Sequence, residues 1–133
     1  ACHFECEISI RRYRAGGTIT LKKESKMDRN IAELALNMGY SVDVQVNGDS
    51  MTPCLFSGDK VAICSETSYK IGDIVVFYYD WTNTVVIHRV IKIFSDLYWC
   101  RGDHSKDIQK VPKNDIMGRV FKIMRNPENF YFK

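Results

Sequence analysis

Hydrophobic and polar residues alternate along most of the chain after residue 40, which is typical of strands with one buried face. Val42, Val44 and Val46 alternate with Asp43 and Gln45, so the three valines would share one face. Apolar runs of similar length, some of them directly after a Gly-Asp turn, predict further strands at 59–64, 73–79, 84–94, 96–101 and 115–124. The pattern therefore predicts a mainly β protein.

The segment before these strands has helical spacing instead. Apolar residues recur every three or four positions over 27–38, and Gly39 is a typical helix stop. The buried stripe of this one N-terminal helix is predicted to consist of Met27, Ile31, Leu34 and Met38. Residues 1–26 alternate only weakly and are expected to form an extended arm or short strands. Because no linker interrupts the chain, residues 1–133 are expected to be one domain with a β core over 42–124.

The composition is that of an ordinary globular protein. The chain has 133 residues, a length usual for one domain, and its 45% hydrophobic and 26% charged residues exclude a disordered or low-complexity chain. The net charge of +3 comes from residues 1–30, where seven basic residues outnumber four acidic ones, while residues 31–133 hold twelve of each. Since a nucleic-acid binder carries a basic stripe on its folded domain, no nucleic-acid partner is expected.

The cysteines favour free thiols over a metal site. The five cysteines are odd in number and form no Cys-x-x-Cys pair, and Cys2, His3 and Cys6 supply only half of a metal-ligand set. We therefore expect no metal and no cofactor, and a cytoplasmic location where thiols stay reduced. No apolar run approaches the roughly 20 residues of a membrane helix, so no membrane span is expected.

The first candidate for chemistry is Ser50, which follows the turn at Gly48-Asp49 and precedes Met51 and Pro53. A tight bend at the end of a strand exposes a hydroxyl and brings backbone amides near it, and such amides can stabilise an oxyanion. Taken alone, however, a serine after Gly-Asp is more often a turn residue.

A histidine and two aspartates strengthen the catalytic interpretation. His88 lies within the apolar strand 84–94, where alternation places it on the same face as Val86 and Val90. The polar loop after the next strand offers Asp103 and Asp107. A serine nucleophile needs a base within hydrogen-bond reach, histidine titrates near neutrality, and a carboxylate can orient its ring.

The ordered motifs GDSMTP, GDIVVF, VIHRVI and RGD resemble those of the LexA/signal peptidase superfamily of serine peptidases, over about Val44 to Met124. The resemblance implies a coiled antiparallel β-sheet and peptide or protein substrates. It places Ser50 at the nucleophile and His88 at the base, as in the archaeal and endoplasmic-reticulum branch. It also implies an orienting aspartate, which points to Asp107, with Asp103 as the nearer motif residue.

The sequence departs from the superfamily pattern at two points. Classical signal peptidases carry an N-terminal membrane anchor, which this sequence does not show. Many also carry a serine at the position of Gly48, where it assists the oxyanion hole. The hole would then be built from backbone amides such as that of Ser50, with Gly48, Met51 and Pro53 as the expected oxyanion and substrate-binding surroundings.

The leading hypothesis is a soluble serine endopeptidase, with leader- or signal-peptide processing in peptide maturation as its candidate role; the sequence is also similar to small soluble relatives in bacterial peptide-maturation clusters. One alternative is self-cleavage at Ala15-Gly16, a bond similar to the one cut by LexA-like proteins. Another is a non-catalytic regulatory or dimerisation module. The sequence is also compatible with a homodimer. Lys92 is the alternative base, but it lies ~13 Å along the strand from His88. An ordinary histidine base predicts a rate that rises with pH near ~6.5–7.

Overall fold

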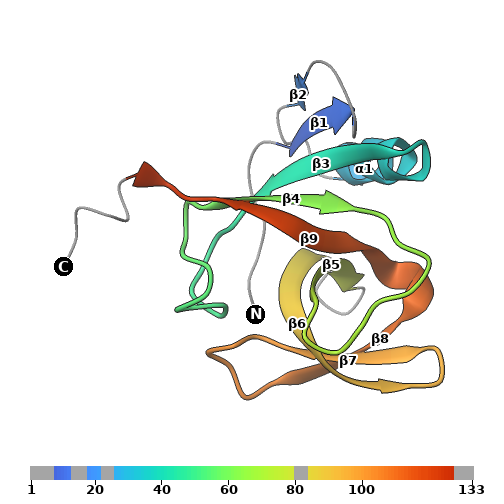
Figure 1. Ribbon diagram of the computed structural model, residues 1–133, viewed down its shortest axis with the longest axis vertical. Coiled ribbons are helices and arrows are strands. Elements are labelled where there is room, and N and C mark those ends of the chain that lie inside the picture. Colours follow the sequence, from blue (N-terminus) through green and yellow to red (C-terminus); the bar gives the residue numbers. More distant parts are fainter. Residues whose placement is uncertain (1–7, 13–17, 22–25, 80–83, 128–133) are drawn as a thin grey trace.

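The computed structural model describes residues 8–12, 18–21, 26–79 and 84–127, with side chains from residue 31 onward except Thr84. Nine strands form one antiparallel sheet in the order β2-β1-β3-β4-β9-β5-β6-β7-β8 (Figure 1). The elements are β1 (Ile8–Arg12), β2 (Thr18–Leu21), α1 (Lys26–Asn37), β3 (Tyr40–Gln45), β4 (Lys60–Cys64), β5 (Ile74–Tyr79), β6 (Thr84–Phe94), β7 (Leu97–Arg101), β8 (Ile108–Pro112), a 3₁₀ turn (Lys113–Asp115) and β9 (Ile116–Met124). The prediction of a mainly β fold with a coiled antiparallel sheet and one helix is confirmed.

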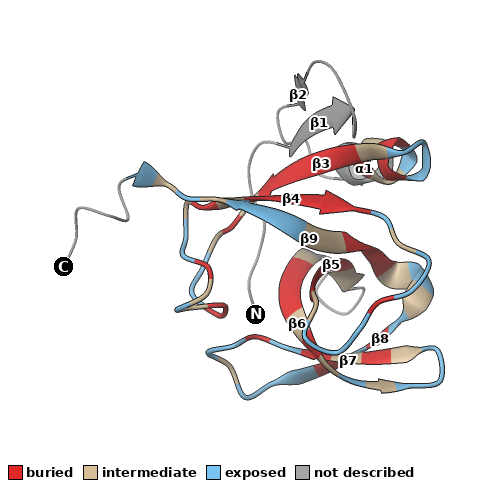
Figure 2. Cartoon of the chain, in the orientation of Figure 1, coloured by how far each residue is buried: buried red, intermediate tan, exposed pale blue. Residues whose placement is uncertain are grey.

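The sheet coils because β9 belongs to two parts of it. The first half of β9 pairs with β5, and the second half pairs with β4. Figure 1 shows β5 to β8 curling round below β9, with β3, β4 and α1 above it. Two apolar clusters form the core, one between α1, β3, β4 and one face of β5 and β6, the other within β5 to β8, and the buried strand segments are visible in Figure 2. Adjacent residues Val75 and Val76 point into the two different clusters, as strand alternation requires.

The helix lies where the sequence predicts it, but the predicted apolar stripe is wrong at Leu34 and Met38, and the side chain of Met27 lies outside the described residues. Leu34 and Met38 are 60% and 65% exposed. The residues that pack into the core are Ile31, in part, and Ala32, Ala35 and Leu36. The helix is thus rotated so that two alanines face the sheet, and their small side chains allow close packing. Gly39 ends the helix as expected, with φ of 91° and its N–H donating to the carbonyl oxygen of Leu36.

The Gly-Asp turns before β4 and β5 are stabilised as the sequence predicts. The Asp59 carboxylate accepts a hydrogen bond from the Phe56 N–H, and the Asp73 carboxylate accepts one from the Lys70 N–H. Each aspartate therefore closes the turn that begins three residues before it. The sequence gives no prediction of strand β8, whose pairing with β7 becomes important below.

Two sequence-based expectations concern the N-terminal region. The half-set Cys2, His3 and Cys6 and the Ala15-Gly16 bond all lie outside the described residues.

Among the residues that the structure describes, no three His, Cys, Asp or Glu side chains cluster as metal ligands. Within the same residues, no helix has the length and apolar character needed to cross a membrane.

Candidate active site

Ser50 lies in a closed loop between β3 and β4. Two hydrogen bonds of 2.8 Å close the neck of this loop, from the Val46 N–H to the Asp59 oxygen and from the Gly58 N–H to the Val46 oxygen. Met51, the residue next to the serine, is fully buried in the core, so the loop is anchored beside the hydroxyl. Ser50 itself is 7% exposed.

The structure brings His88 to Ser50. The Ser50 Oγ lies 3.2 Å from the His88 Nε2, within hydrogen-bond distance. The imidazole is fully buried and packs edge-to-face on Phe77, with ring centroids 6.1 Å apart. Its neighbours Val86 and Val90 belong to the cluster enclosed by β5 to β8, which confirms the predicted strand face. A hydroxyl and an imidazole from sequence positions 38 residues apart therefore meet in one place.

The second ring nitrogen of His88 binds Gln109, a residue that the sequence analysis did not select. The Nδ1 of His88 lies 2.6 Å from the amide oxygen of Gln109. Gln109 is on β8, where buried and exposed residues alternate, and it shares the inward face with Val111. The only sequence signal for it is this short alternation, which requires β8 to be recognised first.

The two predicted orienting aspartates lie elsewhere. Asp103 forms a paired interaction with Arg89, with hydrogen bonds of 2.9 Å from both Nε and Nη2. Asp107 is exposed, and its backbone N–H donates to the Ser105 Oγ. Asp103 is drawn away from the imidazole because Arg89 follows His88 directly and points to the opposite side of β6. The expected carboxylate at Nδ1 is thus replaced by a neutral amide.

Gly102 passes so close to the Ser50–His88 pair that a side chain there would collide with it. A Cβ on Gly102 would lie 2.6 Å from the Ser50 carbonyl oxygen and 3.0 Å from the His88 Nε2. Two residues later, the His104 N–H donates to that same Ser50 oxygen over 2.7 Å. The segment that begins with the Arg-Gly-Asp motif therefore lies directly against the main chain of Ser50.

Burial lowers the pKa of His88 from its usual value of 6.5 to about 4. The hydrogen bond with Gln109 and the negative charges of Asp103 and Asp107 act in the opposite direction, more weakly. The ring is therefore neutral at pH 7, which is the form that accepts a proton. Burial also raises the pKa of the nearby Cys100 thiol to about 12, so this cysteine stays protonated.

Lys92, the alternative base, points away from the site. Strict alternation would place Lys92 on the face of His88, but the pairing of β6 with β7 shifts between Val90 and Lys92. Beyond this bulge the Lys92 ammonium lies over the Trp99 ring, 4.8 Å from its centroid, and Lys110 does the same at 4.6 Å.

The predicted oxyanion and substrate-binding surroundings are divided between core and surface. Gly48 is exposed, with φ of 89° at the turn before Ser50, and Pro53 is exposed on the far side of the loop. The Met51 side chain is buried in the core and faces no solvent. Of these three residues, Gly48 and Pro53 remain available to a substrate.

The comparison with known proteins identifies a family. The chain matches the family described as Peptidase S24-like over residues 8–121. The chain belongs to this family. No curated protein matches the sequence. The match of this S24-like chain spans nearly all of the sheet and includes Ser50, His88 and Gln109, so the fold and the general serine peptidase character are those of the family.

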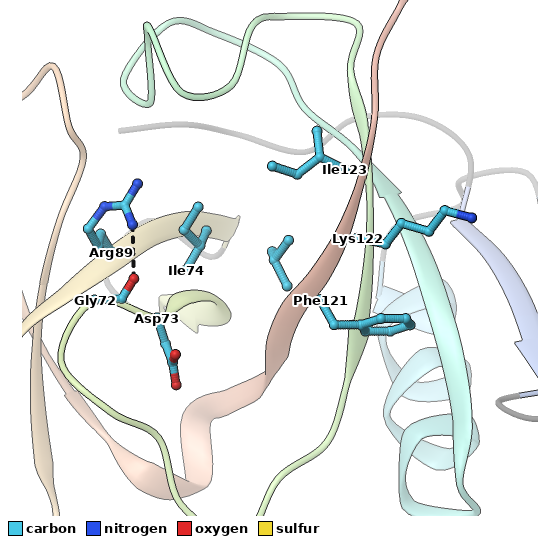
Figure 3. A pocket seen from close by; sticks show the side chains of 8 residues that line it. Gly72, Asp73, Ile74, Arg89, Phe121, Lys122 and Ile123 are labelled. Atoms are coloured by element: carbon cyan, nitrogen blue, oxygen red, sulfur yellow. Dashed lines mark hydrogen bonds between the residues drawn. The ribbon is translucent and has the colours of Figure 1, made fainter.

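The S24-like chain also has an open hollow of about 320 Å³ beside β9. Ile74, Val120 and Ile123 are among its lining residues, with Arg89 at one side (Figure 3). Arg89 donates a 2.9 Å hydrogen bond to the Gly72 oxygen at the same side. The hollow lies on the Arg89 side of β6, and neither Ser50 nor His88 lines it.

Proposed function

We propose that this S24-like chain hydrolyses peptide bonds in extended peptide substrates, with Ser50 as nucleophile and His88 as general base. The observation that carries the proposal is the 3.2 Å contact between Ser50 Oγ and His88 Nε2, combined with the second contact that fixes the ring. The family supports serine peptidase chemistry in general, and the two residues supply the parts that such chemistry needs.

The reaction follows from the positions of these atoms. Ser50 Oγ attacks the carbonyl carbon of the scissile bond while its proton passes to His88 Nε2. The proton then passes from Nε2 to the leaving amine, which breaks the C–N bond and leaves an acyl group on Ser50. A water molecule gives its proton to Nε2 and attacks the acyl carbon, and the acid product leaves as Ser50 Oγ regains the proton. Backbone N–H groups of the Ser50 turn would stabilise the oxyanion.

The pairing of β6 supports an extended substrate. Thr84 to Arg89 pair with β5 on one side, whereas pairing with β7 on the other side begins at Arg89 and Arg101. The β6 segment before His88 is therefore not paired with β7. An extended peptide can add along that edge and present its carbonyl group to Ser50. Leader or signal peptides, cut after small residues, are the substrate class that the superfamily resemblance favours.

The proposal is tested with a serine-reactive fluorophosphonate probe and an internally quenched peptide library. The wild-type protein is expected to be labelled on Ser50 and to cleave peptides with small residues before the scissile bond. Ser50→Ala and His88→Ala are each expected to abolish both signals, because the two groups act as one unit. Ser57→Ala, an exposed serine in the same loop, is the matched control and should retain both.

A second measurement separates cleavage of other peptides from self-cleavage. Wild-type protein is incubated with an excess of the Ser50→Ala protein, and intact masses are followed. Loss of residues up to Ala15 from wild type alone, with no peptide hydrolysed, would assign the activity to self-processing. Unchanged masses and no labelling at Ser50 would contradict the peptidase proposal.

A further inference from the structure

We propose that Gln109 is the positioning residue of this site: its amide oxygen holds His88 in the one tautomer that can accept the Ser50 proton. The catalytic consequence rests on the proposed function, whereas the tautomer itself does not. Gln109 contacts neither Ser50 nor a reacting atom, so it acts through the imidazole.

The argument starts from hydrogen-bond chemistry. The amide oxygen of Gln109 can only accept, so the 2.6 Å contact requires the hydrogen on Nδ1. In a neutral imidazole the other nitrogen then carries the free lone pair. That nitrogen, Nε2, is the one that lies 3.2 Å from the Ser50 Oγ. With the hydrogen on Nε2 instead, the ring would donate to the hydroxyl and could not remove its proton.

The position of Gln109 is fixed by two strand pairings. On β8 it lies opposite Cys100 of β7, and Cys100 lies opposite Val90 of β6, two residues from the histidine. Gln109 is 6% exposed, and its inward direction follows from the alternation of β8. A buried polar side chain placed by sheet register has few alternative partners, so the contact with His88 is maintained by the fold.

The choice of an amide has a chemical consequence. A carboxylate would stabilise the positively charged imidazolium, but an amide supplies no charge. Among the described residues, the charged groups that act on the ring are Asp103, which is paired with Arg89, and the exposed Asp107. The ring packs on Phe77 of β5, and the protonated Cys100 of β7 belongs to the same apolar cluster as Phe77. His88 therefore stays neutral, and able to act as a base, well below pH 6.

This role is tested by nitrogen-15 NMR of the histidine rings, which needs no substrate. The three histidines are assigned from His88→Ala and His104→Gln proteins. In the wild type, His88 is expected as the Nδ1–H tautomer. In Gln109→Leu the Nε2–H form should gain population, and in Gln109→Glu, which keeps the shape, the pKa of His88 should rise by about one unit or more. Lys110→Leu, on the outer face of the same strand, should change neither.

Activity gives the second readout. Gln109→Leu is expected to lower kcat/KM at least about tenfold, and Gln109→Glu to move the acid limb of the pH profile upward and to raise the plateau. A wild-type Nε2–H tautomer, or an unchanged His88 pKa in Gln109→Glu, would overturn the positioning role. If the NMR results are as expected but neither the wild type nor any variant hydrolyses peptides, the proposed function is wrong and the tautomer assignment still holds.

Discussion

Arg89 binds Asp103 through two parallel hydrogen bonds of 2.9 Å, and so ties the strand that carries His88 to the loop that crosses Ser50. The hydrogen bond with Asp103 raises the pKa of the Arg89 guanidinium, which is therefore charged at every relevant pH. Two consecutive residues of β6 therefore make different contacts on its two faces. His88 meets the serine on one face, and Arg89 fixes the neighbouring loop on the other.

Asp103→Asn is expected to weaken this tie with little loss of stability. Both side chains are partly exposed, at 31% and 23%, so the unfolding free energy should fall by about 1 kcal/mol or less. The rate at which the fluorophosphonate labels Ser50 should nevertheless fall clearly, although the loss of stability is small. The reason is that Gly102 precedes Asp103 and moves with it. Asp107→Asn, in the same loop, should affect neither quantity. The reverse result would identify Asp107 as the functional aspartate.

Gly102→Ala is expected to abolish activity. The new methyl group would meet the Ser50 carbonyl oxygen, which is backbone and cannot swing aside. The segment must then shift, and a displacement of about 1 Å at a catalytic pair costs on the order of a hundredfold in rate. Peptide hydrolysis and the melting temperature provide the measurements. Ser105→Ala is the control, and near-normal hydrolysis by Gly102→Ala would contradict the close approach.

The buried imidazole predicts a pH-dependent loss of stability. The pKa of His88 is about 4 in the folded protein and about 6.5 when unfolded, so the unfolded chain binds the extra proton between these values. Stability should therefore fall as the pH drops from 6.5 to 4, by about 3 kcal/mol in total. The measurement is the difference in unfolding free energy between wild type and His88→Gln across this range. His104→Gln, at an exposed position, should show no such difference.

Asp59 and Asp73 occupy equivalent Gly-Asp turns but should differ in their contribution to stability. Asp59 is fully buried and binds the Arg125 guanidinium at 2.7 Å and the Asn126 N–H at 2.9 Å, in addition to its own turn. Asp59→Asn should lower the unfolding free energy by about 2 kcal/mol, because the buried carboxylate loses its charge and with it the charge-assisted hydrogen bond from the exposed Arg125. Asp73→Asn keeps an oxygen that can accept the Lys70 N–H and loses only the negative charge, so it should cost about 1 kcal/mol or less. Chemical denaturation of both variants measures the difference, and equal losses would contradict it.

Alternation and turn residues alone predict much of this protein. They give the strands from β3 to β7 and β9 within a residue or two at each end, and the helix with its glycine stop. They also place Ser50 at a turn that ends a strand and His88 within an apolar strand, and the order of the surrounding motifs then singles out the two residues. These features are local, and local backbone chemistry decides them.

Tertiary structure decided which groups meet. The side of α1 that is buried depends on how closely the helix approaches β3, so the alanines face inward where the larger Leu34 and Met38 were expected. A bulge in β6, invisible in the sequence, turned Lys92 to the outer surface. Gln109 became the partner of His88, in place of an aspartate, only through the register of β8 on β7. Register and bulges arise from contacts between strands distant in the chain, and a residue's own neighbours carry no information about them.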